Sequence, residues 1–261
     1  MTRIGFLVPP GNPTVEPEMM RLAPSGVTVH FTRMVAHGEA GSHQGQEERN
    51  RSQIAHLDEN VALLAMVKPA VIAMAHTAMS ATLGKEGEKK LVEHLERSSG
   101  IRFITAFGSV LLALANLGVR RVALATPYSA DATLKTKAHL EAHGVRVVSF
   151  GNLDNVKNIY EETPERAYAL ARRVDTPEAH AVFISGVGMP SIDVLERLER
   201  ELGKPVISAA SATMWNALHV AGVATPVVGY GSLLSGASVR SFSWLVKANP
   251  RRTSQCTWES V

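Results

Sequence analysis

Short apolar segments alternate along the chain with longer segments in which apolar residues recur at helical spacing. The apolar segments predict β-strands at residues 4–8, 27–34, 70–75, 102–106, 121–125, 145–150, 181–185 and 206–208. The runs AVIAMA and AVFIS are continuous, which is typical of strands covered on both faces. Strands separated by helices predict an α/β fold with parallel sheets and right-handed crossovers.

The helical segments complete this pattern. They predict helices at residues 46–67, 107–117, 164–173 and 212–221. Three further helices are expected after the strands at 70–75, 121–125 and 181–185, and they should end near residues 97, 143 and 202. Residues 9–18, PPGNPTVEPE, are expected to form a loop after the first strand.

The element pattern repeats after about residue 118. Each half opens with a strand and a Pro-containing loop, and each has a later buried strand that ends in a small-residue loop, AHTAMS or SGVGMP. We therefore expect two pseudo-symmetric parallel-sheet αβα halves with an active site between them. The first half should comprise residues 1–118, completed by 210–246, and the second residues 119–209, with 247–261 as a polar tail.

Composition narrows the classes of function. The 27 Lys and Arg residues nearly balance the 24 Asp and Glu residues, without the basic clusters of nucleic-acid-binding faces. No stretch reaches the roughly 18 apolar residues of a membrane helix, and MTRIGFLVPPGN predicts a strand and turn rather than a signal peptide. The only cysteine, Cys256, excludes an internal disulfide and a Cys-rich metal site. We expect a cytoplasmic protein without a metal, nucleic-acid or membrane partner.

Two loops of the first half hold candidate site residues, because ligands of parallel sheets bind beyond the carboxyl ends of the strands. Asn12 offers amide donors near a helix start, although a turn or helix cap is the alternative. His76 directly follows the strand at 70–75 and is placed for proton transfer near neutral pH. Thr77 and Ser80 beside it could hold an oxyanion. A structural histidine is the alternative for His76.

Three loops of the second half add further candidates. Tyr128 could donate a hydrogen bond to a carboxylate or could pack over the seam between the halves. Asn155 lies in the loop GNLDN, where capping is the default interpretation. Gly186 and Val187 belong to a small-residue loop that enters a helix, and its N–H groups can cradle an anion. Walker, GxSxG and HExxH motifs do not occur.

These loops resemble those of maleate cis–trans isomerases and arylmalonate decarboxylases, in the aspartate/glutamate racemase superfamily. The resemblance runs from Ile4 to about Leu234 and is carried by PPGNPTVEPEM, AHTAMSATLG, ATPYSAD, GNLDN, FISGVGMPSIDVLERLERELGKPVISAASATMWNAL and VGYGSLL. It implies a site between two halves, a small carboxylate substrate and no cofactor, and it allows a homodimer. By position, it assigns carboxylate binding to Asn12, Thr77, Tyr128, Asn155 and the backbone of Val187.

The sequence departs from this family at the catalytic positions. The resemblance implies chemistry with one or two cysteines, one from each half, yet His76 stands at the first position and Gly186 at the second. Cys256 lies outside the matched region. We therefore expect His76 to act as a single acid/base with Tyr128 as a second catalytic residue. Gly186 should leave open space on the opposite face of the pocket.

The expected function is a cofactor-independent enzyme acting on a small carboxylic acid by lyase, decarboxylase-like or isomerase chemistry. Three alternatives stay open. A maleate cis–trans isomerase would need a replacement nucleophile, and histidine adds to alkenes less readily than a thiolate. A hydrolase would use His76 to activate water. A non-catalytic carboxylate-binding pseudoenzyme would explain the loss of both cysteines.

Overall fold

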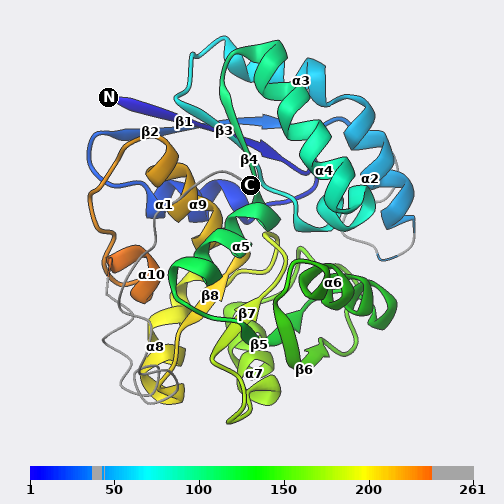
Figure 1. The fold of residues 1–261 in the computed structure, drawn as a ribbon, viewed down its shortest axis with the longest axis vertical. Coiled ribbons are helices and arrows are strands. Elements are labelled where there is room, and N and C mark those ends of the chain that lie inside the picture. Colours follow the sequence, from blue (N-terminus) through cyan, green and yellow to red (C-terminus); the bar gives the residue numbers. More distant parts are fainter. Residues whose placement is uncertain (37–42, 44, 237–261) are drawn as a thin grey trace.

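The computed structural model describes residues 1–36, 43 and 45–236, and it contains two four-stranded parallel sheets (Figure 1). The first sheet has the order β2-β1-β3-β4 and the second the order β6-β5-β7-β8. The strands are β1 (Thr2–Val8), β2 (Val27–Arg33), β3 (Val71–Met74), β4 (Arg102–Thr105), β5 (Arg121–Thr126), β6 (Arg146–Asn152), β7 (Ala181–Ile184) and β8 (Val206–Ser208). The two sheets follow the same order, so the expected α/β class with two equivalent halves is confirmed.

The central strands are the most deeply buried parts of the sheets. Every residue of β3 and β7 is buried, as the continuous apolar runs predicted. The edge strand β2 is only partly buried. Ile4 of β1 pairs with Val29 on one side and Val71 on the other, in parallel register.

Helices pack around both sheets. They are α1 (Val15–Leu22), α2 (Gln46–Ala55), α3 (Leu57–Ala65), α4 (Thr77–Ser99), α5 (Ala106–Asn116), α6 (Ala130–Ala142), α7 (Pro164–Val174), α8 (Ile192–Leu202), α9 (Ala209–Val220) and α10 (Ser232–Ser235). Within the described ranges, none of these helices is both long and apolar enough to cross a lipid bilayer.

Two helical predictions need correction. Helix α1 occupies part of the segment expected as a loop, because Pro17 lies in its first turn, where the missing N–H costs no helical hydrogen bond. The helix expected at 46–67 is divided into α2 and α3 at His56. The backbone of His56 leaves the helical region, at φ −108° and ψ 10°, and its ring Nδ1 donates to the Ser52 carbonyl at 2.8 Å.

A continuous core joins the two halves. The largest cluster of buried side chains includes Phe6 from the first sheet and Phe183 from the second. Helix α9 follows β8 in sequence, but it packs against α1, α5 and β3 as well as β8. Figure 1 shows α5 and α9 in the middle of the molecule, between the two sheets. Residues 237–246 and the predicted tail at 247–261 lie outside the described residues.

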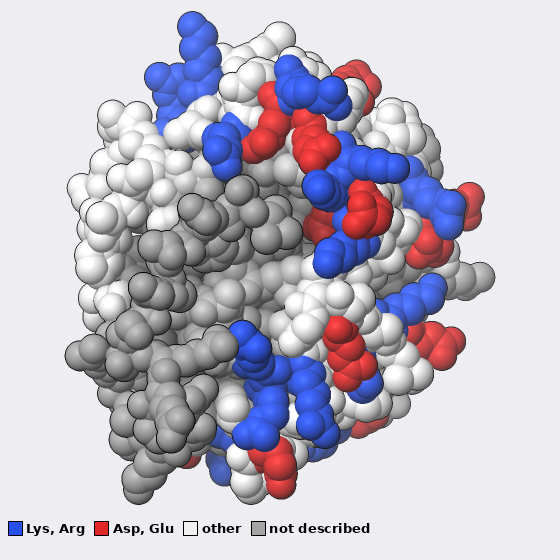
Figure 2. Space-filling view, in the orientation of Figure 1, with Lys and Arg blue, Asp and Glu red and all other residues white. Residues whose placement is uncertain are grey.

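The charged side chains on the face shown in Figure 2 are of both signs. Lys and Arg alternate with Asp and Glu along the right-hand side of this view. Neighbouring ion pairs on the surface, such as Arg173 with Asp154 and Arg197 with Glu201, reflect this mixture. Exposed pairs of this kind contribute little to stability, so the core carries the fold.

Glu18 of α1 connects the first half to the start of α8 in the second. Its Oε1 accepts the backbone N–H groups of Ser191, at 2.8 Å, and Ile192, at 3.2 Å. The residue is only 5% exposed. Burial raises the pKa of the Glu18 carboxyl to about 7, although both hydrogen bonds favour the charged form.

We expect Glu18→Gln to be more stable than the wild type at about pH 8 and nearly equal to it at about pH 4. Because the pKa of the Glu18 carboxyl is raised from 4.5 to about 7, the folded protein favours the protonated form. The resulting contribution to stability is complete below pH 4.5 and is lost as the pH rises through 7. Glutamine keeps an acceptor for both N–H groups and cannot ionise, so the gain at about pH 8 should be about 1–3 kcal/mol. Urea unfolding at both pH values measures it, and a pH-independent difference would contradict it.

Candidate functional site

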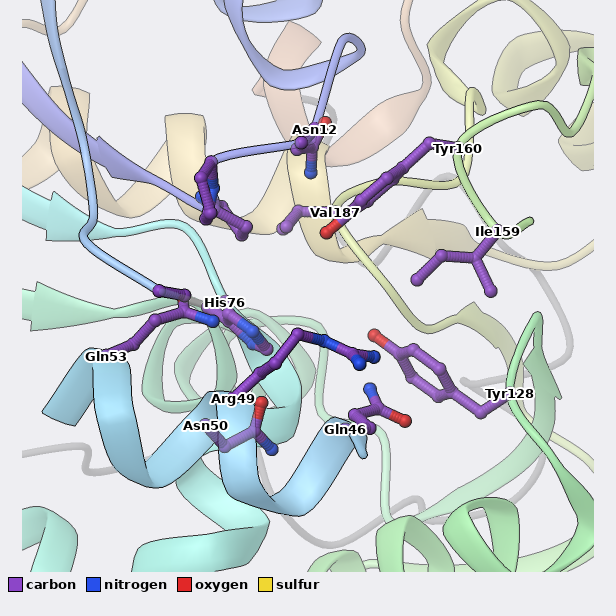
Figure 3. Close-up of a pocket in the computed structure, with 15 residues that line it drawn as sticks. Asn12, Gln46, Arg49, Asn50, Gln53, His76, Tyr128, Ile159, Tyr160 and Val187 are labelled. Carbon is purple, nitrogen blue, oxygen red and sulfur yellow. The ribbon is translucent and has the colours of Figure 1, made fainter. Parts of the chain in front are cut away.

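A small pocket lies beyond the carboxyl ends of the central strands of both sheets. Asn12 follows β1, His76 follows β3, Tyr128 follows β5 and Val187 follows β7, and all four line the pocket (Figure 3). The pocket therefore draws on equivalent strand ends of the two halves, as is usual for ligand sites of open parallel sheets. The cavity is only about 40 Å³, which suits a small ligand.

His76 is held between β3 and α4 with its ring at the pocket. Its backbone is extended, at φ −154°, and its N–H donates to the Met74 carbonyl at 2.9 Å. The residue is 8% exposed. Burial, together with the positive charge of Arg49, lowers the pKa of His76 to about 4. The imidazole is therefore neutral at pH 7 and able to accept a proton.

The two ends of the Asn12 side-chain amide have different roles: the oxygen bonds to the backbone before α1, and the nitrogen faces the pocket. Its Oδ1 accepts the backbone N–H groups of Thr14, at 2.8 Å, and Val15, at 3.2 Å, which stabilises the turn that leads into α1. Its Nδ2 points into the pocket (Figure 3) and is buried without a hydrogen-bond partner among the described residues. An unpartnered buried donor costs free energy, so a carboxylate oxygen in the pocket would satisfy it.

Tyr128 and Thr77 meet at the pocket wall. The Tyr128 hydroxyl lies 3.1 Å from Thr77 Oγ1. Burial raises the pKa of the Tyr128 phenol, so at neutral pH it stays protonated and can donate a hydrogen bond. Thr77 does not itself line the cavity, and it acts here as the partner of this hydroxyl.

The open space expected at Gly186 is absent. A Cβ atom built on Gly186 would lie 3.0 Å from the Tyr128 hydroxyl and 3.1 Å from Pro127 Cγ. The backbone of Gly186 has φ +91°, which side-chain-bearing residues rarely adopt. The two residues after β5 therefore fill the place that a side chain at residue 186 would take.

Ser80 and Asn155 are not among the residues that line this pocket. Ser80 is fully buried in α4, and its hydroxyl donates to Glu88 Oε1 at 2.6 Å. The other Glu88 oxygen lies 3.8 Å from His139 Nε2, on α6 of the second half. Asn155 occupies a left-handed backbone conformation, φ +55°, in the loop after β6. Its amide side chain suits that turn.

Sequence reasoning missed one whole wall of the pocket. Helix α2 contributes a single face, spaced i, i+3, i+4 and i+7, made up of Gln46, Arg49, Asn50 and Gln53 (Figure 3). Tyr160, from the loop after β6, adds an aromatic ring. Glu47, Glu48 and Arg51 occupy the other face of α2, so both faces are polar and the sequence carries no signal that one of them covers a pocket.

The charge of the pocket favours an anion. None of the described residues that line it is Asp or Glu, whereas Arg49 brings a positive charge. Burial raises the pKa of the Tyr160 phenol, and Arg49 opposes this shift, so its charge reaches both sides of the cavity. Over the described part of the chain, no group of three His, Cys, Asp or Glu side chains is arranged to hold a metal ion.

Comparison with known proteins gives a consistent result over most of the chain. The model of the arylmalonate decarboxylase family matches residues 4–234. A maleate isomerase of Nocardia farcinica is 32% identical over 249 residues, which cover 89% of this chain and 95% of that protein. An arylmalonate decarboxylase of Bordetella bronchiseptica is 28% identical over 240 residues, or 88% and 95% of the two chains.

Solved structures agree with this result. A variant of the maleate isomerase Iso from Pseudomonas putida S16, with maleate, superimposes with a TM-score of 0.82 at 27% identity. The match covers 91% of this chain and 99% of that chain. A Nocardia farcinica maleate cis–trans isomerase with a covalently bound succinylcysteine intermediate gives a TM-score of 0.82 at 30% identity, over 91% and 99% of the chains.

Proposed function

Since this chain belongs to the arylmalonate decarboxylase family, we propose that its pocket binds a small carboxylic acid and that His76 moves a proton on it. The chain is a cofactor-independent enzyme of the isomerase or lyase kind, and its relatives include a maleate isomerase and an arylmalonate decarboxylase. The observation that carries the proposal is that His76 lines the same cavity as Tyr128 and as Asn12, whose Nδ2 is a buried donor without a partner among the described residues.

The donors act on the charge that develops during the reaction. Asn12 Nδ2 and the Tyr128 hydroxyl can donate to a carboxylate, and Val187 lines the same cavity. When a bond to the carbon beside the carboxylate breaks heterolytically, its electron pair spreads into the carboxylate as an enediolate. Fixed donors in a small, buried pocket stabilise that negative charge more than mobile water does.

His76 can serve in either direction of proton transfer. In an isomerase, the neutral imidazole takes a proton from the carbon beside the carboxylate and returns it at a different position. In a decarboxylase-like reaction, the C–C bond breaks, CO₂ leaves, and the imidazolium delivers its proton to the carbon. The second route requires a protonated His76. A bound carboxylate favours that form, because it offsets the positive charge of Arg49.

Maleate isomerisation is the second candidate, favoured by the maleate isomerase of Nocardia farcinica among the relatives. It faces a chemical obstacle in this chain. The sole cysteine is Cys256, which lies outside the described residues. His76 would have to add to the double bond, and imidazole is a weaker nucleophile than a thiolate toward alkenes.

A turnover screen in deuterated water tests the proposal. Purified wild-type protein is incubated with maleate, substituted malonates and related small acids, and the products are followed by NMR. Deuterium at a single carbon of the product supports proton transfer by the enzyme. Fumarate from maleate supports the second candidate, and uptake of water points instead to the hydrolase alternative. No turnover, with equal thermal stabilisation of wild type and His76→Ala by the same acid, would establish a binding protein.

A further inference from the structure

Helix α4 is divided into two segments by a kink at Gly84, where the backbone leaves the helical region at φ 67° and ψ 171°. The first segment, residues 77–83, begins directly after His76. It carries Thr77, the partner of the Tyr128 hydroxyl. The first segment therefore sets where His76 lies at the pocket, and its direction depends on the angle at the kink.

A buried hydrogen bond joins the two segments across this kink. Ser80 Oγ, in the first segment, donates to Glu88 Oε1, in the second, at 2.6 Å. In a straight helix, residues eight positions apart are separated by roughly 12 Å along the axis, which is beyond the combined reach of a serine and a glutamate side chain. The bond can form only in the kinked helix, so it fixes the angle between the two segments.

Glu88 is held in turn by the second half of the molecule. Its Oε2 lies 3.8 Å from Nε2 of His139 on α6, and the His139 ring packs on that of Phe107 in α5, with ring centroids 4.2 Å apart. Burial opposes the charge of the Glu88 carboxyl, but His139, Ser80 and the nearby Thr105 together hold its pKa below the ordinary value of 4.5. A charged, 8% exposed carboxylate therefore lies where α4 and α6 meet.

We propose that Glu88 is a positioning residue for His76, which acts through Ser80 and the first segment of α4. The inference rests on the proposed function for the proton transfer by His76. Thr77 and Ser80 are three residues apart, so they lie on one face of the first segment. Thr77 Oγ1 contacts the Tyr128 hydroxyl at 3.1 Å. This face is therefore attached to the second half twice, directly through Thr77 and indirectly through Glu88.

Loss of the Ser80–Glu88 bond should affect the chemical step more than substrate binding. Without the bond, the first segment can change its angle at the kink and carry His76 with it. A displacement of about 1 Å at a reacting group can slow a reaction by about 100-fold. Asn12 lies between β1 and α1, so its donor stays in place for the substrate carboxylate. We therefore expect kcat to fall while KM changes little.

Two substitutions of similar size separate the hydrogen bond from the filling of space. Glu88→Met removes the acceptor, whereas Glu88→Gln keeps it as an amide oxygen. With an acid that the wild type converts, we expect Glu88→Met to lower kcat by about 10- to 100-fold with KM nearly unchanged. Glu88→Gln should keep most of the activity.

Ser80→Ala removes the donor with a smaller disturbance of the core, because it deletes one oxygen atom. It should resemble Glu88→Met, and it decides the question where the methionine variant does not fold. Ser98→Ala is the matched control in the second segment of α4, where Ser98 Oγ donates to the Leu95 carbonyl of the same segment at 3.2 Å. This control should change neither kcat nor KM.

A second measurement needs no substrate. The ring resonances of His76, assigned by their loss in His76→Ala, are compared by NMR in the wild type, Ser80→Ala and Ser98→Ala. We expect them to shift and broaden in Ser80→Ala, because the first segment then adopts more than one angle, and to stay unchanged in Ser98→Ala. A residue that only stabilised the fold would lower the midpoint of urea unfolding and leave these resonances in place.

Three outcomes would overturn the inference. They are wild-type kcat in both Ser80→Ala and Glu88→Met, unchanged His76 resonances in folded Ser80→Ala, and a loss of kcat in Glu88→Gln as large as that in Glu88→Met. Failure of the proposed function has a different signature, which is full turnover by His76→Ala or no turnover of any acid by the wild type. In that case the NMR comparison alone decides whether Glu88 positions His76.

Discussion

Replacing His76 with alanine is expected to lower kcat by about 10²- to 10⁴-fold, the usual contribution of a positioned general acid or base. The side chain lies at the pocket, between β3 and α4, and alanine removes the imidazole while leaving the strand and α4 intact. The measurement is steady-state kinetics on whichever acid reacts in deuterated water. His94→Ala is the matched control, because His94 is an exposed histidine paired with Asp58 outside the pocket.

The pH profile of the wild type identifies the form of His76 that reacts. With a pKa of about 4, the imidazole is neutral from about pH 6 upward. A base mechanism therefore gives kcat/KM that is flat above about pH 6 and falls as the pH drops through about 4. A mechanism that needs the imidazolium shows the opposite slope, with kcat/KM falling as the pH rises. Full activity of His76→Ala would remove the residue from the mechanism altogether.

Gly186→Cys is expected to destabilise the fold by about 2–5 kcal/mol and to produce no new thiol chemistry. The substitution returns a cysteine to the second position assigned by the resemblance, but the neighbouring side chains would have to shift to admit its Cβ. A side chain at φ +91° is strained, and its Cβ would approach the Tyr128 hydroxyl and the rigid ring of Pro127. Left-handed backbone costs about 1–2 kcal/mol for a non-glycine residue, and overpacking adds about 1–3 kcal/mol.

Urea unfolding of two alanine variants separates the cost of backbone strain from the cost of overpacking. Gly186→Ala should lose nearly as much stability as the cysteine variant, because both add the same Cβ. Gly203→Ala has a similar positive φ, +64°, with nothing within 4 Å of its added Cβ, so it should lose only the backbone strain. Equal losses in Gly186→Ala and Gly203→Ala would mean that Tyr128 and Pro127 yield without cost.

The sheet and its loops could be predicted because their residues leave few alternatives. The runs at 70–75 and 181–185 are too apolar and too short for anything but strands buried on both faces. Once the strands are known to be parallel, their carboxyl ends must converge. The positions of Asn12 and His76 at the pocket follow from this rule. It does not tell which side chains of each loop turn inward, and Ser80 turns into the α4–α6 contact instead.

The α2 wall could not be predicted from local pattern. Gln46, Arg49 and Gln53 are side chains that on most helices face solvent, and nothing in their spacing indicates that the strand ends lie beneath them. Whether a polar helix face is solvated or covers a pocket depends on tertiary packing. Helix α1 was missed for a different reason, since Pro17 is a turn signal in isolation and a good first-turn residue in context.

The way Tyr128 and Pro127 fill the space over Gly186 bears on the handedness of the product. His76 and Tyr128 lie on opposite sides of the cavity in Figure 3, and Tyr128 holds its proton tightly because burial raises its pKa. On the proposed function, a planar enediolate held between them would exchange a proton with His76 on one face only. A prochiral substrate would therefore give a single enantiomer of the product, and only one enantiomer of a racemic substrate would react.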